Sequence, residues 1–213
     1  MRNLVFSSLA IILLSGCSMN LFNSFTPSSL PPQSQTGSYS WFRADTGRFL
    51  FRSSIDIYRN HFSGLILIKP TSESHRILFI TETGIKVFDM EYFSPGKYDV
   101  HYCMESVNRK PLIKTLGNDF SLMLYSVSDN SRIKIFTDSR SARMVIRSTD
   151  DAGKRFCFIN AKTGRVEELV KTGLLCNKVN IRFFSDLPWG PDSIAISHYN
   201  IKFNIRLTKI DEN

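Results

Sequence analysis

The chain has 213 residues, of which 42% are hydrophobic and 12% aromatic, and it carries a formal net charge of +8 at pH 7. Its Lys and Arg residues are scattered singly, with no run of five or more. We interpret the positive balance as a solvated basic surface, with an anionic lipid surface or an acidic partner as the alternative. No nucleic-acid-binding motif is present, so nucleic acid is not expected as a partner.

The N-terminus predicts export. Arg2 gives a positive start, and the residues from Leu4 to Leu14 are mostly apolar, a run too short for a permanent bilayer-spanning helix. The run ends in Leu14-Ser15-Gly16-Cys17, which resembles the bacterial lipobox. That resemblance implies a signal peptide over residues 1–16, cleavage before Cys17, and acylation of Cys17. A secretory signal with a chance cysteine, or a membrane-anchoring helix, remains the alternative.

Residues 17–38 are rich in Ser, Asn, Pro, Gln and Thr and are predicted to form a lipidated, flexible tether. A single β-rich domain is expected over residues 39–213. The anchor makes the membrane a partner through Cys17, and Ser18 after it, in place of Asp, favours the outer membrane facing the periplasm.

From residue 49 onward the sequence breaks into short runs, mostly of alternating apolar and polar residues, separated by turn residues, which is typical of an antiparallel meander. The predicted strands are Phe49–Tyr58, Phe62–Ile68, Arg76–Thr81, Ile85–Phe93, Tyr98–Met104, Arg132–Thr137, Ala142–Ser148, Arg155–Asn160, Val166–Lys171, Lys178–Phe184, and a final pair or bent run from Ser193 to Leu207.

The stretch Pro111–Tyr125 has helical period instead, with an apolar stripe at Leu112, Leu116, Phe120, Met123 and Leu124. Lys114, Asn118, Asp119 and Ser121 are expected largely on its other faces. Gly117 predicts either a kink or a close neighbour. Because a helix with one apolar stripe must pack on something, the predicted fold is mainly β: a long, curved antiparallel sheet (an unclosed β-barrel) with this helix on its concave face. The stripe either lines a cavity that holds an acyl chain or packs directly on the sheet.

No catalytic constellation is apparent, so the chain is not expected to be an enzyme, and no cofactor or metal is expected. His101 and Cys103 share a predicted strand face, but the other ligands of a structural zinc site are not evident. The adjacent pair Glu167-Glu168 is expected to point to opposite faces of a strand. Cys103, Cys157 and Cys176 allow at most one disulfide, with buried thiols as the alternative.

Several segments together resemble a known family. These are the acylated cysteine and tether, the strands Ile55–Tyr58 and Gly64–Lys69, the stretch Thr83–Asp89, and the helix Pro111–Tyr125. They are similar to the outer-membrane lipoprotein carrier and receptor superfamily, the LolA/LolB-like fold. The resemblance implies an unclosed barrel whose cavity binds lipid or the acyl chains of lipoproteins and aids their localisation. A structural or interaction lipoprotein of the cell envelope, with a filled core and no small-molecule ligand, is the alternative.

Overall fold

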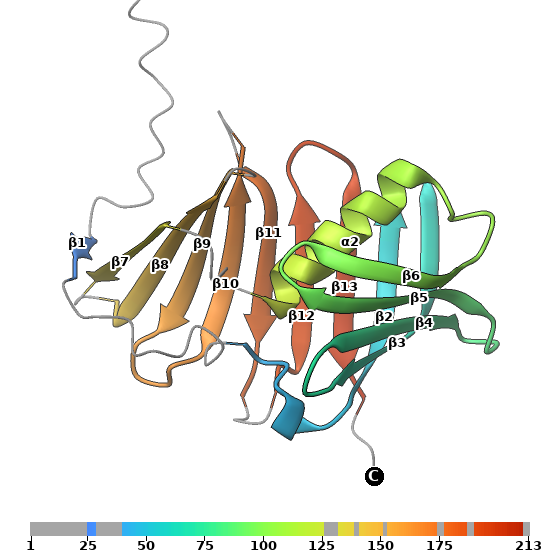
Figure 1. The fold of residues 1–213 in the computed structure, drawn as a ribbon, viewed down its shortest axis with the longest axis horizontal. Coiled ribbons are helices and arrows are strands. Elements are labelled where there is room, and N and C mark those ends of the chain that lie inside the picture. Colours follow the sequence, from blue (N-terminus) through green and yellow to red (C-terminus); the bar gives the residue numbers. More distant parts are fainter. Residues whose placement is uncertain are drawn as a thin grey trace, which may run out of the picture.

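The structure is a computed structural model, and it describes residues 25–28, 40–125, 132–138, 141–150, 153–173, 177–186 and 190–210. These residues form thirteen strands, one short 3₁₀ helix and one α-helix (Figure 1). The elements are β1 (Thr26–Pro27), η2 (Ala44–Thr46), β2 (Phe49–Ile57), β3 (Asn60–Pro70), β4 (His75–Thr81), β5 (Lys86–Ser94), β6 (Lys97–Cys103), α2 (Lys110–Leu124), β7 (Arg132–Asp138), β8 (Arg143–Asp150), β9 (Gly153–Asn160), β10 (Val166–Thr172), β11 (Asn177–Phe184), β12 (Ser193–His198) and β13 (Phe203–Lys209).

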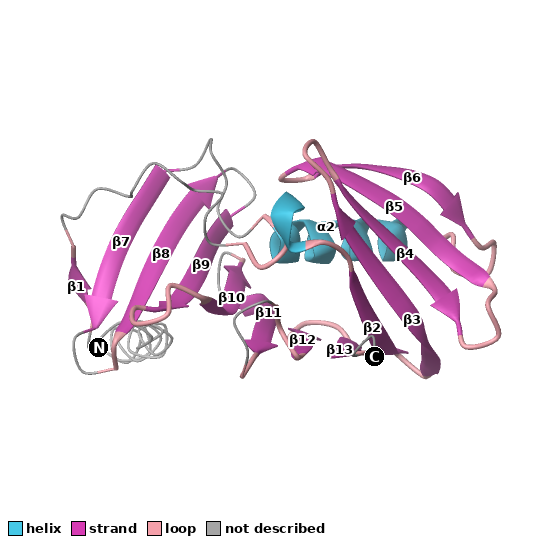
Figure 2. Cartoon of the chain, turned by 90° about the horizontal axis from the view of Figure 1, so that it is seen from below, coloured by secondary structure: helices cyan, strands magenta, loops and turns pink. Residues whose placement is uncertain are grey.

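All thirteen strands belong to one antiparallel sheet, in the order β1-β7-β8-β9-β10-β11-β12-β13-β2-β3-β4-β5-β6. Strands that are consecutive in the sequence pair with each other along most of the sheet, as expected of a meander. The last strand, β13, pairs with β2 over Phe203–Lys209. The final stretch is a pair of strands, β12 and β13. The predicted fold class is confirmed: the sheet is long, curved and unclosed, and α2 lies on its concave side (Figure 2).

Alternation along the strands fills the concave face with apolar side chains. In β2 the residues Phe49, Phe51 and Ile55 point inward and are buried, while Arg52 and Asp56 on the other face are exposed. The remaining strands contribute in the same way, and the largest fully buried side chains include Phe79, Phe88 and Phe203. The concave face therefore holds the main core.

The helix α2 is more deeply buried than one apolar stripe predicts. Its residues from Leu116 to Leu124 are buried except Asn118, and these include Asp119 and Ser121, which were expected largely outside the apolar stripe. Burial extends beyond the stripe because the sheet curls around the second half of the helix: the β5–β6 turn reaches it, and the Gly96 N–H donates to Ser121 Oγ at 2.7 Å. Among the described residues, no helix is both long and apolar enough to cross a membrane.

Gly117 marks a close neighbour. A Cβ atom at this position would lie 2.2 Å from Cζ of Tyr98 on β6. The Tyr98 ring packs beside Tyr92 with centroids 5.6 Å apart, and Tyr92 packs against Phe120 of the helix. Glycine is therefore needed here to let the strand approach the helix.

Candidate functional site

An apolar pocket of about 660 Å³ opens at the N-terminal end of α2. Four parts of the fold build it: the β6–α2 connection, the first turns of the helix, the β2–β3 hairpin, and the β12–β13 loop with the start of β13. Its lining residues are Ile57, Tyr58, Asn60, Phe62, Ser106, Val107, Arg109, Pro111, Leu112, Thr115, Ile201 and Phe203. Its volume lies within the range of roughly 300–1,000 Å³ that is usual for small-molecule sites.

The rim of the pocket is held by backbone contacts between segments distant in sequence. Tyr58 sits in the two-residue β2–β3 turn with φ of 53°, and the residue is 68% exposed. Its N–H donates to the carbonyl of Lys202 at 2.7 Å, which ties the hairpin to the β12–β13 loop. A left-handed conformation is uncommon for a tyrosine. The hydrogen bond to Lys202 holds the turn in this conformation and keeps the Tyr58 ring at the mouth of the pocket.

Basic groups lie at the mouth of the pocket. Arg109, at the N-cap position of α2, is exposed and lines the pocket, and Lys110 follows it. The first turn of the helix contains no acidic residue, and Arg109 makes no side-chain cap. Because a helix N-terminus carries a partial positive charge, both features favour an anionic group at the mouth.

A buried polar pair lies one helical turn beyond the pocket. Thr115 lines the pocket, and Asp119, four residues later, meets His198 at 2.7 Å between Oδ2 and Nε2. The two side chains are only 3% and 8% exposed. The His198 ring also stacks on Phe203, a pocket residue, at 5.1 Å. Burial raises the pKa of the Asp119 carboxyl, and the contact with His198 opposes that rise.

The predicted helix-face residues divide between pocket and core. Leu112 lines the pocket, whereas Leu116, Phe120, Met123 and Leu124 are buried in the main core. Cys17 lies outside the described residues. Sequence reasoning did not find the remaining pocket walls, or the Asp119–His198 pair. Asp119 did carry a signal, because it follows Leu112 by seven residues and so returns to the same helix face.

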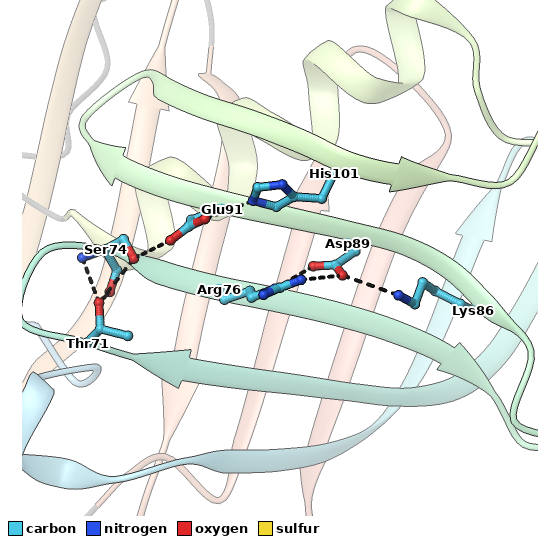
Figure 3. A network of polar contacts seen from close by, with 7 residues as sticks. All are labelled: Thr71, Ser74, Arg76, Lys86, Asp89, Glu91 and His101. Carbon is cyan, nitrogen blue, oxygen red and sulfur yellow. Dashed lines mark hydrogen bonds and ion pairs between the residues drawn. The ribbon is translucent and has the colours of Figure 1, made fainter.

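A second polar arrangement covers the convex face of β4, β5 and β6 (Figure 3). Arg76 donates two hydrogen bonds, both 2.8 Å, to the carboxylate of Asp89, which is only 4% exposed, and Lys86 lies 3.4 Å from it. Hydrogen bonding from Arg76 lowers the pKa of Asp89.

Beside that pair, Glu91 is held by two neighbours. It accepts a hydrogen bond from Ser74 at 2.6 Å and contacts His101 at 2.8 Å. Both contacts lower the pKa of Glu91, with Ser74 the larger cause. Because each of these polar side chains has a hydrogen-bonding or charged partner, the network stabilises this edge of the sheet.

The acidic pair on β10 departs from expectation. The register shifts between Val166 and Glu168, and both carboxylates turn toward Arg143, with Glu167 at 3.1 Å and Glu168 at 3.7 Å. The expectation that they point to opposite faces was wrong, because a bulge breaks strict alternation. With Arg165, Arg182 and Trp41, they line a more polar pocket of about 460 Å³.

No metal-ligand cluster occurs among the described residues. His101 contacts Glu91, while Cys103 and Cys157 are free thiols; Cys176 lies outside the described residues. Burial raises the pKa of both thiols, most strongly for the fully buried Cys157. Comparison with known proteins found no protein-family model that matches this chain and no matching curated protein.

Proposed function

We propose that this protein is a cell-envelope lipoprotein, anchored through an acylated Cys17, that binds one acyl chain in the pocket at the N-terminal end of α2. The observation that carries the proposal is the apolar pocket itself, which is large enough for such a chain and lies between helix and sheet. The unclosed sheet with a helix on its concave face also agrees with the resemblance to lipoprotein carriers and receptors. Aiding lipoprotein localisation at the outer membrane is the role that this resemblance favours.

The chemistry of the walls suits a flexible hydrocarbon. Ile57, Phe62, Leu112, Ile201 and Phe203 offer non-directional apolar contact. A chain that buried about eight methylene groups there would gain roughly 6 kcal/mol before the cost of association. Arg109 and the helix N-terminus would then meet an anionic head group at the mouth.

A fluorescent fatty-acid probe tests the proposal. We expect saturable uptake by the purified, delipidated protein at about one site per chain. Ile201→Trp fills the pocket and should weaken binding at least tenfold, whereas Ile85→Trp, the same change at an exposed turn residue, should leave it unchanged. Arg109→Gln should weaken binding of the fatty acid but not of the corresponding fatty alcohol. Uptake that does not saturate, or that Ile201→Trp leaves intact, would remove the acyl-binding proposal.

A structural or interaction lipoprotein is the second candidate function. It is favoured by the packing of Phe120 and Met123, which fill the concave face beyond the pocket rather than line a space. It predicts co-purification of a membrane partner with the protein, unaffected by Ile201→Trp.

A further inference from the structure

The N-terminal segment is fixed to the far edge of the sheet, at the opposite end from β6. Thr26 and Pro27 form β1, which pairs with Thr137 and Phe136 of β7 (Figure 1). The Ser28 N–H donates to the carbonyl of Ile135 at 3.0 Å, and Thr26 Oγ1 donates to the carbonyl of Thr137 at 3.3 Å. These residues fall within the stretch predicted to be a free tether.

Phe25 strengthens this attachment. It packs against a small apolar cluster made of Val145, Phe156, Phe158 and Val170, with Phe136 beside it. The neighbours of these residues along the strands, such as Ile146 and Cys157, belong to the main core instead. Because successive side chains point to opposite faces, the small cluster lies on the convex face of β7–β10.

The convex face beside this cluster is basic. Lys134 pairs with Arg147, and Arg132 and Lys154 flank Thr149 in the next row. The alternation of side chains places all four on the same face as Phe136, Val145 and Phe156. Arg132, Lys134 and Lys154 are exposed, and Arg147 lies over the Phe136 ring at 5.2 Å. We call Arg132, Lys134, Arg147 and Lys154 the basic strip.

The attachment shortens the reach of the anchor. Eight residue steps separate Cys17 from Phe25, and they span at most roughly 28 Å when fully extended. A free tether as far as residue 38 would span roughly 75 Å. An acyl anchor on Cys17 therefore keeps the β7 edge, and with it the basic strip, close to the lipid head groups.

We infer that the basic strip is a membrane-facing surface that contacts anionic phospholipid head groups. The inference rests on the anchor at Cys17 in the proposed function, and it is independent of whether the pocket binds an acyl chain. Charge complementarity favours this occupant, because each basic side chain near an anionic leaflet strengthens attachment about fivefold. Pairing of β1 with β7 would thus set the orientation of the whole domain on the membrane.

The test uses the full acylated protein in vesicles of phosphatidylcholine and phosphatidylglycerol that contain a spin label on the lipid head group. A fluorophore is attached at Thr149→Cys, within the strip, or at Thr208→Cys, on the convex face of β13. Wild-type protein taken through the same labelling gives the background from the native thiols. We expect quenching at position 149 to exceed that at position 208 at least threefold.

Two sets of variants test whether the basic side chains cause the quenching at position 149. The triple variant Arg132→Glu, Lys134→Glu, Lys154→Glu should lower quenching at position 149 to the level at position 208. The triple variant Arg52→Glu, Lys69→Glu, Arg206→Glu makes the same charge change at exposed sites on β2, β3 and β13 and should leave the difference intact. Phe25→Asp, which detaches β1, should also reduce quenching at position 149.

Equal quenching at both positions, or no effect of the first triple variant, would overturn the inference while leaving the anchor in place. Failure of the wild-type protein to float with the vesicles would overturn both the anchor and the inference. A third result is protection of the label at position 149 from quenching, to a degree that grows with protein density and needs no anionic lipid. That result would indicate that a second copy of the chain covers the strip, and it would overturn the inference too.

Discussion

Substituting Gly117 by Ala tests how closely β6 packs on the helix. In an exposed helix this change would stabilise the protein by about 1 kcal/mol. Here the added Cβ would lie 2.2 Å and 2.4 Å from Cζ and Cε1 of Tyr98, so the ring must move. Overpacking of this kind costs about 1–3 kcal/mol, which offsets that gain, and we expect a net loss of up to about 2 kcal/mol in the free energy of unfolding.

Urea unfolding of the variants measures this loss. Asn118→Ala, at the neighbouring exposed position of the same helix, should change stability by less than about 0.5 kcal/mol. In a Tyr98→Ala background, Gly117→Ala should become neutral or stabilising, because the clash is gone. A stabilising effect of Gly117→Ala in the wild-type chain would refute the reasoning.

Two further predictions concern charged and titrating groups. Asp89→Asn should lower the free energy of unfolding by about 2 kcal/mol, because it weakens the two bonds from Arg76, whereas Asp56→Asn, in an exposed pair with His61, should cost less than about 0.5 kcal/mol by urea unfolding. Burial lowers the pKa of His75, so the unfolded chain binds its proton more readily, and this contribution to stability is lost as the pH falls from about 6.5 toward the lowered value. His75→Gln should flatten that part of the stability–pH curve; identical curves for His75→Gln and wild type would contradict the assignment.

The strands were predictable from the sequence because their signal is local. Phe49, Phe51 and Ile55 lie two and four residues apart, on one face of a strand, and glycine at the Thr81–Gly84 turn supplies the positive φ of 85° that the turn needs. The helix was equally clear from its four-residue spacing. A curved sheet with one helix follows from these elements, because few other arrangements bury the apolar face of the sheet and the apolar face of the helix together.

The candidate site was much less predictable, because it depends on contacts between distant segments. Ile57 and Ile201 meet at the pocket only because β13 pairs with β2, which no local pattern indicates. The strand register also determines where the side chains of Glu167 and Glu168 point. The bulge that shifts this register has no clear signal in the sequence. Residue 25 belonged to a stretch polar enough to be read as a tether, yet Phe25 packs on an apolar cluster, and Thr26 and Pro27 after it pair with β7.

The position of the pocket follows from the uneven burial of α2. Its second half is enclosed by the sheet and the β5–β6 turn, so Phe120 and Met123 act as core residues and leave no room for a ligand. Its first half projects toward the β2–β3 and β12–β13 loops, where Leu112 and Thr115 are only half-buried. An occupant at this end would cover apolar surface without displacing any core side chain. Binding there would therefore add to the stability of the folded domain, by an amount that grows with ligand concentration.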